Sequence, residues 1–394
     1  MSMLYDNNAV DESHGVENSA QTDWELLRFQ FPVAKQYVYF NHAAVAPLSL
    51  SVRKQIAVCA ARFCEKGIVC NSEFLGVADT TRQLAAQLIN AERSQIAFVK
   101  NTTQGILVVA NGIRWEKGDN VVIPEKEFPA NVYPWLNLSR KGVETRFVPL
   151  KYGRFTDEDI YRRVDKRTRA VSVSAVSFTN GFRCDLEKIG QLCKNEGIIF
   201  VVDAIQALGA LEIDVGKSHV DVLAADSHKW LLGPQGIGIL YVSAAAMDKL
   251  EVSNLGWKSM EDEGDYLNYD IRLKQSAARF EEGTLNIVGI AGLKASLEML
   301  LGIGIPFIQR RILALNDTII QNLSDRGYAV KSSLSPGERS GILSFMHQDI
   351  PTEKLYAKLF ENDVVCAHRD GAIRISPHFY NNDVDILRFV KALY

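Results

Sequence analysis

A series of short apolar runs between about Phe98 and Val242 constrains the fold of this chain more than any other feature of its sequence. The runs are rich in Val and Ile and are bounded by turn residues; they read NVVIPE, ETRFVPL, AVSVSAV, GIIFVVDA, VDVLAAD and GIGILYV. Segments with helical spacing lie between some of them, namely TTQGILVVANGI, FPANVYPWLNLSRKG and DLEKIGQLCKNEG. This alternation predicts an α/β fold, in which helices cover both faces of a mostly parallel sheet.

The chain is long enough for two domains, because it has 394 residues. A long helix begins in LNIVGIAGLKASLEMLLGIG and leads into a second set of helices and strands that closes with NDVDILRFVKAL. We therefore expect a large domain over residues 31–288 and a smaller α+β domain over residues 289–394. The first part of the large domain could pack on the small one. Residues 1–30, which begin with a polar and acidic stretch, are expected to form a flexible tail.

Composition argues against several classes of partner. The formal net charge of −3 gives no reason to expect binding to nucleic acid or to an anionic membrane. No apolar run reaches the roughly 18 residues of a membrane span, and the N-terminus lacks the pattern of a signal peptide, so we expect a cytoplasmic protein. The cysteines form no C-x-x-C pair and no zinc-ligand spacing, which predicts reduced thiols and no metal site. They are Cys59, Cys64, Cys70, Cys184, Cys193 and Cys366.

Two charged residues follow apolar runs at the point where each predicted strand ends. Asp203 closes GIIFVVDA, and Lys229 follows VDVLAAD in the stretch ADSHKWLLGPQGIGILYV. Ligands bind at the carboxyl ends of parallel strands. A lysine and an aspartate there suit a pyridine cofactor, because the lysine forms a Schiff base with its aldehyde and the carboxylate keeps its ring nitrogen protonated. The alternatives are a helix N-cap at Asp203 and a surface lysine that extends its amine into water.

A candidate phosphate site lies in KNTTQGI, which follows the apolar run IAFV and opens a helix. Thr102 and Thr103 offer hydroxyl groups at a helix N-terminus, where backbone N–H groups and the helix dipole favour an anion. A plain N-cap formed by either threonine is the alternative. The stretch GPQGIGI lacks the Walker lysine and precedes a strand, so we interpret it as a turn. Together with Asp203 and Lys229, the threonines indicate pyridoxal 5′-phosphate.

The same residues carry a resemblance to a known family. The motifs NHAAVAPL, NTTQGI, EFPANVYPW, VVDAIQALG, SHKWLLGPQGIGILYV, RFEEGTLN and AIRISPHFYNN occur in the family's order and cover nearly the whole chain beyond residue 30. They resemble the class V aminotransferases, in the branch that holds cysteine desulfurases, isopenicillin N epimerase and kynureninase. The resemblance implies the type I fold of pyridoxal-phosphate enzymes: a large domain with a mostly parallel seven-stranded sheet and a smaller C-terminal α+β domain. It also implies a homodimer with shared active sites.

The resemblance implies a role for each cofactor-binding position. Lys229 would carry the Schiff base and then move protons, and Asp203 would pair with the ring nitrogen. Phe128 would lie flat on the ring, although core packing is the alternative for one aromatic residue in a loop. The remaining contacts would be made to the phenolic oxygen by Gln206, to the phosphate by Thr102, Thr103 and His228, and to the phosphate of the partner subunit by Thr284.

The substrate would be held by residues from both ends of the chain. Arg374, in AIRIS, would bind the α-carboxylate through two parallel hydrogen bonds; a surface ion pair is its alternative. Asn41 and His42 would line the mouth of the site, and a structural role is equally open for His42.

Several positions depart from the cysteine desulfurase pattern. The loop that carries the catalytic cysteine of those enzymes is missing here, and Cys366 stands inside the apolar run VVCA, where neither exposure nor a lowered pKa is expected. Phe128 replaces a histidine and cannot transfer protons. Phe178 stands near an expected asparagine, for which Asn180 could substitute. Asp226 replaces a serine and is not expected to contact the phosphate.

These observations predict a pyridoxal-phosphate-dependent aminotransferase that acts on a small amino acid. A β-eliminating lyase, of the cysteine desulfurase or selenocysteine lyase kind, is the first alternative, and an epimerase is the second. A cofactor-binding protein without turnover and a nucleotide-binding α/β protein are the remaining ones. The intact Lys229, Asp203 and Arg374 argue against a protein without turnover, and no DNA-binding helix pair or basic patch is visible.

Overall fold

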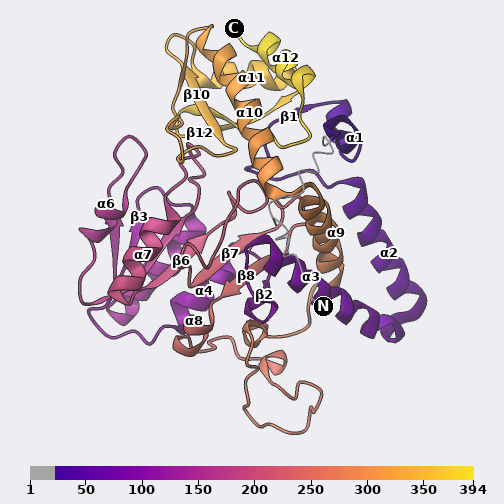
Figure 1. Cartoon of the computed structure of the whole chain (residues 1–394), viewed down its shortest axis with the longest axis vertical. Helices are drawn as coiled ribbons and strands as arrows, with labels where there is room; N and C mark the ends of the chain where they lie inside the picture. The colour runs from indigo at the N-terminus through magenta and orange to yellow at the C-terminus, as the bar shows by residue number, and fades with distance from the viewer. Residues whose placement is uncertain (1–22) are drawn as a thin grey trace, which may run out of the picture.

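The computed structural model describes residues 23–394, which form a central sheet flanked by helices and a smaller unit beside it (Figure 1). The central sheet has seven strands in the order β2-β8-β7-β6-β5-β3-β4. Only β8 runs against the others, since it pairs antiparallel with both β7 and β2. The strands are β2 (Ile96–Val99), β3 (Asn120–Pro124), β4 (Glu144–Val148), β5 (Thr168–Ser174), β6 (Ile199–Asp203), β7 (Val222–Asp226) and β8 (Gly238–Val242).

The predicted α/β fold with a mostly parallel seven-stranded sheet is therefore confirmed, and each of the six apolar runs from NVVIPE to GIGILYV contains one of its strands. The prediction of a single helix in FPANVYPWLNLSRKG is wrong. That segment is broken into a short 3₁₀ turn at Pro129–Asn131, the single-turn helix α5 (Tyr133–Leu136) and a second 3₁₀ turn at Asn137–Lys141. Pro129 and Pro134 explain the breaks, because proline has no N–H to donate within a helix.

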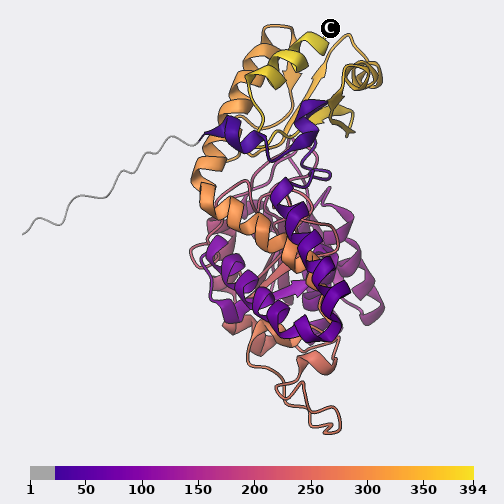
Figure 2. The ribbon, with the colours of Figure 1, turned by 90° about the vertical axis from the view of Figure 1, so that its right-hand side faces the viewer.

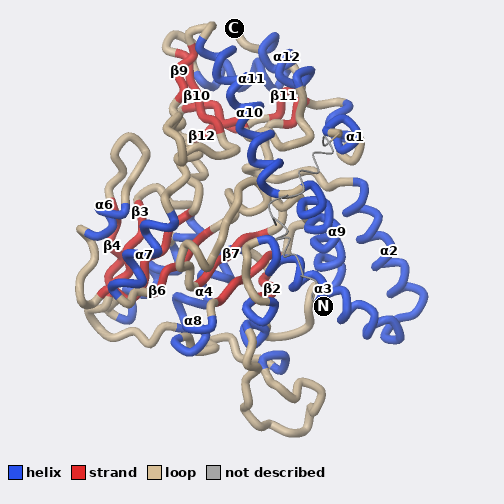
Figure 3. Tube along the Cα trace, in the orientation of Figure 1, coloured by secondary structure: helices blue, strands red, loops and turns tan. Residues whose placement is uncertain are grey.

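Side chains alternate between the two faces of the sheet and build two apolar cores. In β6, Phe200 and Val202 pack with residues of α7 and α9, whereas Ile199 and Val201 pack with α4, α5 and α8. Figure 3 shows the resulting order of helix, strand and helix layers. The helices of the two faces are α3 (Asn71–Leu88), α4 (Thr102–Gly112), α6 (Asp157–Tyr161), α7 (Leu186–Glu196), α8 (Ala244–Lys249) and α9 (Ile287–Ile303).

Helix α4 lies unusually close to the sheet, and Gly105 is the reason. A Cβ atom at Gly105 would stand 2.5 Å from Cβ of Ala224 in β7. No real pair of carbon atoms tolerates that distance, so only glycine lets the first turn of α4 approach the end of β7 this closely. The glycine of TTQG therefore positions the helix N-terminus against the sheet.

Helix α9 packs between α2 (Leu50–Lys66) and α3 on the side of the large unit (Figure 1). The boundary expected after residue 288 thus falls within the first turn of α9, and the chain leaves this unit only in α10 (Ile305–Ser324). The first half of α10 contributes Ile308 and Ile312 to the core of the large unit, and its second half contributes Leu315 and Ile319 to the core of the small one. Figure 2 shows α10 running between the two.

The small unit consists of an antiparallel sheet in the order β12-β13-β10-β9 with helices packed on it. Its elements after α10 are β9 (Tyr328–Val330), β10 (Leu343–His347), α11 (Thr352–Glu361), β11 (Val364–Val365), β12 (Ala367–Arg369), β13 (Ala372–Ile375) and α12 (Asp383–Ala392). The start of the described chain joins this unit, because β1 (Val38–Tyr39) pairs in parallel with β11.

Part of the expected N-terminal tail is folded. Residues 1–22 lie outside the described residues, but residues 23–30 contain the helix α1 (Trp24–Arg28). Arg28 donates two hydrogen bonds to the buried Asp385 carboxylate in α12, at 2.6 and 2.8 Å. The expectation of a loose tail is therefore wrong for residues 23–30, since this ion pair fastens α1 to the small unit.

Within residues 23–394, no single helix is both long and apolar enough to cross a membrane. Only α9 and α10 taken together reach that length and composition, and a bend of 80° separates them. The remaining 3₁₀ turns lie at Pro32–Lys35, Gly67–Cys70, Arg93–Gln95, Trp257–Ser259 and Ala277–Phe280.

Candidate active site

Asp203 and Lys229 lie together at the carboxyl edge of the central sheet. Asp203 is the last residue of β6 and stands opposite Ala224 of the neighbouring strand β7, which Lys229 follows by three residues. Both side chains are buried: the residues are 1% and 7% exposed. The structure thus brings together the two residues that the sequence paired, and a lysine that extends its amine into water does not fit such burial.

One carboxylate oxygen of Asp203 makes no hydrogen bond within residues 23–394. Its Oδ1 accepts a hydrogen bond from the backbone N–H of Ile205 at 3.0 Å, whereas Oδ2 is buried and has no partner among residues 23–394. Burial raises the pKa of Asp203 to about 6, against the opposing effects of the Ile205 N–H group and of Lys229. A buried carboxylate oxygen without a donor is costly. A protonated nitrogen placed beside Oδ2 would remove that cost.

The surroundings of the Lys229 amine favour its neutral form. Burial lowers its pKa to about 8, Asp203 opposes this change, and the positive charge of Arg374 adds to it. At neutral pH roughly a tenth of such amines would be unprotonated, compared with fewer than about one in a thousand for an ordinary lysine. The amine lies 5.3 Å from the centre of the Phe128 ring. Lys229 can therefore act both as a nucleophile and as a base.

Phe128 lies above this lysine with much of its ring open. The residue is 41% exposed, and the ring of Phe178 meets it edge-to-face with the centroids 5.2 Å apart. Core packing does not account for so exposed a ring. A free aromatic face next to the Lys229 amine suits a planar ligand, which would stack on it.

Glu127 is a residue of this site that the sequence did not reveal. Its carboxylate accepts hydrogen bonds from the backbone N–H of Ser174, at 2.7 Å, and from the Ser174 hydroxyl. Ser174 is the β5 neighbour of Asp203. Burial raises the pKa of Glu127 to about 7; the bonds from Ser174 lower it and the charge of Asp203 raises it. Glu127 therefore fixes the start of the loop that carries Phe128. An acidic residue just before Phe128 was the available signal.

The predicted phosphate contacts surround the N-terminus of α4. Asn101, not Thr102 or Thr103, caps this helix, so the N-cap alternative is wrong for both threonines. The Thr102 hydroxyl accepts the backbone N–H of Asp226 at 3.0 Å, which ties α4 to the end of β7, and Thr103 is half-buried beside it. His228 Nδ1 lies 3.1 Å from the Asp226 carboxylate. Neither His228 Nδ1 nor Asp226 Oδ1 makes a hydrogen bond within the described chain. The helix N-terminus remains a favourable place for an anion.

Gln206 is buried, and its side-chain amide forms two hydrogen bonds with other protein groups. Its Nε2 donates to the backbone oxygen of Ala43 at 2.9 Å, and its Oε1 accepts from the Trp230 indole at 2.9 Å. One N–H of the amide is left for a ligand oxygen. The side chain also joins the N-terminal segment to the stretch that follows Lys229, so it has a structural role that the sequence did not indicate.

Arg374 and Asn41 bring polar groups to the site from the small unit and from the start of the chain. Arg374 is 2% exposed; its Nη1 donates to the backbone oxygen of Phe178 at 2.6 Å, and its Nε is buried without a partner in the described chain. Burial, together with the charge of Arg369, lowers its pKa to about 10. Asn41 Oδ1 is likewise buried without a partner. A surface ion pair, the alternative for Arg374, is therefore wrong.

Comparisons with known proteins agree with this geometry. The family profile described as "Aminotransferase class-V" matches residues 38–389. The chain is 31% identical to a probable cysteine desulfurase of Methanothermobacter thermautotrophicus, over 92% of this chain and 95% of that protein. It is 27% identical to the uncharacterized aminotransferase YcbU of Bacillus subtilis, over 78% of this chain and 81% of that protein. The chain belongs to the class V aminotransferase family.

A solved structure agrees in fold. A mutant of the protein C-DES, with glycine covalently linked to its pyridoxal-phosphate cofactor, superposes with a TM-score of 0.85 at 22% identity and covers 92% of this chain and 98% of that one. Pyridoxal 5′-phosphate is the cofactor of the family, and the residues present here fit it. Asp203 Oδ2 offers an acceptor for the ring nitrogen, Lys229 an amine for the aldehyde, Phe128 a stacking face and the α4 N-terminus an anion site.

Not every residue predicted for this class V site faces it. His42 is buried, with Nδ1 bonded to the backbone oxygen of Ser376 at 2.7 Å and Nε2 to the Tyr380 hydroxyl at 2.8 Å. Burial lowers its pKa to about 4, so the ring is neutral. Both nitrogens are occupied by the protein, and the structural alternative for His42 is the one that fits.

Asn180, the possible substitute for the missing asparagine, is bonded to the protein backbone. Its Nδ2 donates to the backbone oxygen of Gly153 at 3.0 Å, and its Oδ1 accepts from the backbone N–H of Phe182. These two bonds hold the Asn180 amide within a turn, and its contact with the ligand stays a prediction. Thr284 is exposed, and its contact with a partner subunit stays a prediction.

Cys366 does not behave as a catalytic thiol. It stands between β11 and β12, it is 4% exposed, and burial raises its pKa to about 12. A sulfur nucleophile needs access and a stabilised thiolate, and Cys366 has neither. The departure from the desulfurase pattern that the sequence suggested thus has a structural basis.

Proposed function

We propose that this protein is an aminotransferase that uses pyridoxal phosphate to act on a small α-amino acid. The observation that carries the proposal is the buried pair at the sheet edge, where Asp203 keeps an unpartnered oxygen beside a Lys229 amine whose pKa is lowered to about 8. When bound, the cofactor would supply an electron sink that makes the α-proton of the amino acid acidic.

Each residue of the site would then have its own role in the reaction. Lys229 Nζ, in its neutral form, removes the proton from the substrate Cα. Arg374 binds the α-carboxylate through its free Nε and Nη2 groups, which orients the Cα–H bond toward the lysine. Phe128 closes the site from above and keeps water from the amine, while Asp203 holds a proton at the ring nitrogen.

The groups that can transfer protons in this site favour amino transfer over persulfide formation. Phe128 cannot carry a proton, so Lys229 is left to take the proton from Cα and to deliver it again. Amino transfer asks nothing more of the protein, whereas persulfide formation also asks for an accessible thiol. Cys366 is buried, and its pKa is raised to about 12.

A β-eliminating lyase is the second candidate, because it too can work without a protein thiol. Relatives named as probable cysteine desulfurases support chemistry at a carbon–sulfur bond. The Lys229 base would serve this reaction equally well at its first step.

We further propose a homodimer. Large apolar side chains lie exposed along one protruding segment, namely Leu255, Trp257, Tyr266, Leu267, Tyr269 and Ile271. Several large exposed apolar side chains on one segment favour a protein interface there. The exposed Thr284 follows this segment and would then be available to a neighbouring active site.

A screen of amino acids with and without a keto-acid acceptor tests the reaction. For the protein loaded with pyridoxal phosphate, we expect a new amino acid and a new keto acid only when the acceptor is present. Pyruvate, ammonia and sulfide released from cysteine without an acceptor would favour the lyase. A protein that takes up no cofactor, judged by its visible absorbance, would overturn the whole scheme.

A further inference from the structure

A second arginine lies on the same face of the small sheet as Arg374. In the hairpin of β12 and β13, Arg369 pairs with Ala372 and Ala367 pairs with Arg374. Paired residues of antiparallel strands point to the same face, and so do residues two apart in one strand. Arg369 and Arg374 are therefore diagonal neighbours on one face, with their Cβ atoms about 7–8 Å apart.

This face is the one turned toward the active site. Arg374 on it bonds to the backbone of Phe178, whose ring touches Phe128 above Lys229. His368, between these arginine positions in the alternation, points the opposite way and lies 3.9 Å from Glu353 of α11. The positive charge of Arg369 accordingly lowers the pKa of both Arg374 and Lys229.

Arg369 has no acidic partner in the part of the chain that the structure describes. Its Nη1 donates to the backbone oxygen of the adjacent residue, His368, at 2.8 Å, and no carboxylate lies within 4.0 Å of its guanidinium group. The adjacent acid, Asp370, is held instead by Lys126 at 3.1 Å, from the loop that leads to Phe128. That ion pair fastens the hairpin tip to the large unit and leaves Arg369 uncompensated at the mouth of the site.

Two arginines on one face without an acid between them repel each other, and a ligand with two negative groups would relieve that repulsion. One α-carboxylate can satisfy Arg374, whose guanidinium group is buried, but it leaves the more exposed Arg369 free. A short amino acid with a second acid group on its side chain can reach both, because each guanidinium group stands at the end of a flexible stem.

We propose that Arg369 binds an anionic group on the substrate side chain, so that the preferred substrates are dicarboxylic α-amino acids or their keto acids. The proposal rests on the function proposed above and names the substrate class of that same site. Arg374 takes the α-carboxylate, Lys229 lies at Cα, and Arg369 takes the distal carboxylate. Arg369 thereby determines specificity and takes no part in proton transfer.

Binding without turnover tests this assignment directly. Succinate and butyrate have the same number of carbon atoms but two and one carboxylates, and their binding to the cofactor-loaded protein can be measured by calorimetry. We expect succinate to bind more tightly than butyrate, and Arg369→Gln to weaken succinate by about 10- to 100-fold, as for a lost hydrogen bond to a charged group. Butyrate affinity should change less than about twofold.

Two variants complete the design. Arg369→Lys should recover part of the succinate affinity, because it restores the charge without the fork geometry. Arg114→Gln removes an exposed arginine that pairs with Glu251 beyond the far end of α4, and it should leave both ligands unaffected. Equal affinities of the wild type for succinate and butyrate, or equal losses for both in Arg369→Gln, would overturn the assignment.

Kinetics separate this inference from the proposed function. In Arg369→Gln we expect KM for aspartate or glutamate to rise about 10- to 100-fold, while kcat/KM for alanine stays within about twofold. A wild type that turns over alanine and asparagine as well as the dicarboxylic pair contradicts the role of Arg369 and leaves amino transfer intact. If no amino acid donates its amino group, the proposed function fails, and the succinate measurement still decides the binding role.

Discussion

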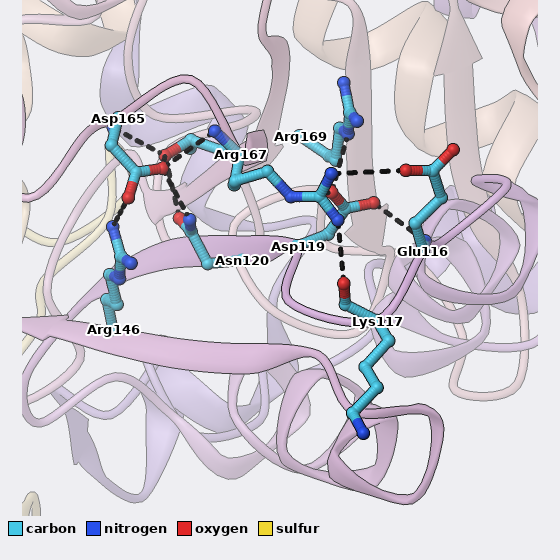
Figure 4. Close-up of polar contacts among 9 residues, drawn as sticks. Glu116, Lys117, Asp119, Asn120, Arg146, Asp165, Arg167 and Arg169 are labelled. Carbon is cyan, nitrogen blue, oxygen red and sulfur yellow. Dashed lines mark hydrogen bonds and ion pairs between the residues drawn. The ribbon is translucent and has the colours of Figure 1, made fainter.

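Charged side chains at the two edges of the central sheet differ in how fully they are paired. At the amino edge, where β3 and β5 begin, acids and arginines form a network of ion pairs (Figure 4). At the carboxyl edge, where β5, β6 and β7 end, Asp203 and Lys229 are both buried, and Asp203 Oδ2 has no partner among residues 23–394. Both edges belong to the same sheet, and β5 reaches both, so the two sets of charged residues can be compared within one structural unit.

Every acid of the amino edge has its cation. The buried Asp119 carboxylate lies 3.2 Å from Arg167 Nε and 3.1 Å from Arg169 Nε, and Asp165 lies 2.7 Å from Arg146 (Figure 4). Burial raises the pKa of Asp119, but the Glu116 N–H group and the two arginines outweigh it and hold the pKa below its ordinary value. Bonds from Arg146 and then Asn120 lower the pKa of Asp165 to about 2. This edge is built for stability.

At the carboxyl edge every shift disfavours charge. The pKa values of Asp203 and Glu127 are raised, to about 6 and about 7, and that of Lys229 is lowered to about 8, each with burial as the largest cause. Such shifts cost stability in the absence of a ligand and are typical of functional sites. The comparison therefore predicts that substitutions at the two edges have opposite consequences.

The largest effect is expected for Lys229→Ala. Without the amine the base that we assign to the Cα proton is lost, so amino-acid turnover should fall by about 10²- to 10⁴-fold, the range of a lost general base. Single-turnover assays with the loaded protein measure the loss, and added small primary amines should restore part of it. Lys229→Arg is the control, because it keeps the charge and removes the base. Turnover that persists in both variants would refute the role of Lys229.

Asp203→Asn should lower activity and raise stability at the same time. Turnover should fall about 100-fold, because an amide holds no proton at the ring nitrogen. The raised carboxyl pKa means that the folded protein binds this proton more tightly than the unfolded chain does. Its contribution to stability is thus complete below pH 3.8 and is lost as pH rises through about 6.

At pH 8 the cofactor-free variant should therefore be more stable than the wild type by about 3 kcal/mol, the equivalent of a shift of roughly two pKa units. Urea unfolding at pH 4 and at pH 8 checks this, and the gain should vanish at pH 4. Lys229 and Glu127 are the titratable groups beside Asp203, and the wild type and the variant both retain them. A variant less stable than the wild type at pH 8 would show that Asp203 is satisfied by the protein.

The opposite sign is expected at the amino edge for Asp119→Asn. The free energy of unfolding should fall by about 2 kcal/mol, below the cost of breaking a fully buried pair, because water screens the half-exposed Arg167 and Arg169. The lowered pKa of Asp119 places this contribution above the ordinary carboxyl pKa, so the difference should shrink as pH falls. Kinetic constants should stay within about twofold. A large loss of turnover would erase the contrast between the edges.

Sequence reasoning predicted the sheet and the Asp203–Lys229 pair for one physical reason. Strand periodicity is local, and parallel strands bring their carboxyl ends to the same edge whatever the loops between them do. The departures came from contacts with distant partners. His42 is bonded to Ser376 and Tyr380, both more than 330 residues away in the chain, and only the fold shows that its ring is fully used.

Glu127 was missed for the same reason. Its significance depends on Ser174, a residue 47 positions away that happens to neighbour Asp203 in the sheet. Asn180 was assigned to the ligand by resemblance, yet two backbone contacts close its amide within a turn. Polar side chains near a motif can thus be located from sequence. Which groups they form hydrogen bonds with cannot be predicted in the same way, because the partners are distant in the chain.

A moderate effect is expected for Phe128→Ala. Loss of the stacking ring should weaken cofactor binding by about 3- to 10-fold, in line with the 0.5–1.5 kcal/mol of an aromatic pair. Stability should change little, because the ring is 41% exposed. Dialysis of the loaded protein followed by absorbance gives the affinity, and Phe128→Tyr is the matched control that should retain it. An unchanged affinity would mean that the ring only shields the Lys229 amine.

The smallest effect on the reaction is expected for Cys366→Ala, and it tests which sulfur chemistry is open to the site. The thiol is buried and its pKa is raised to about 12, so it cannot receive sulfur from a substrate at neutral pH. Turnover of amino acids should remain within about twofold, while the small cavity left behind costs about 1 kcal/mol of stability. Assays for both keto acid and sulfide, run on the variant and the wild type, separate the possibilities. Sulfide or protein persulfide that disappears only in Cys366→Ala would make this cysteine a nucleophile after all, and would require β11 and β12 to open during the reaction.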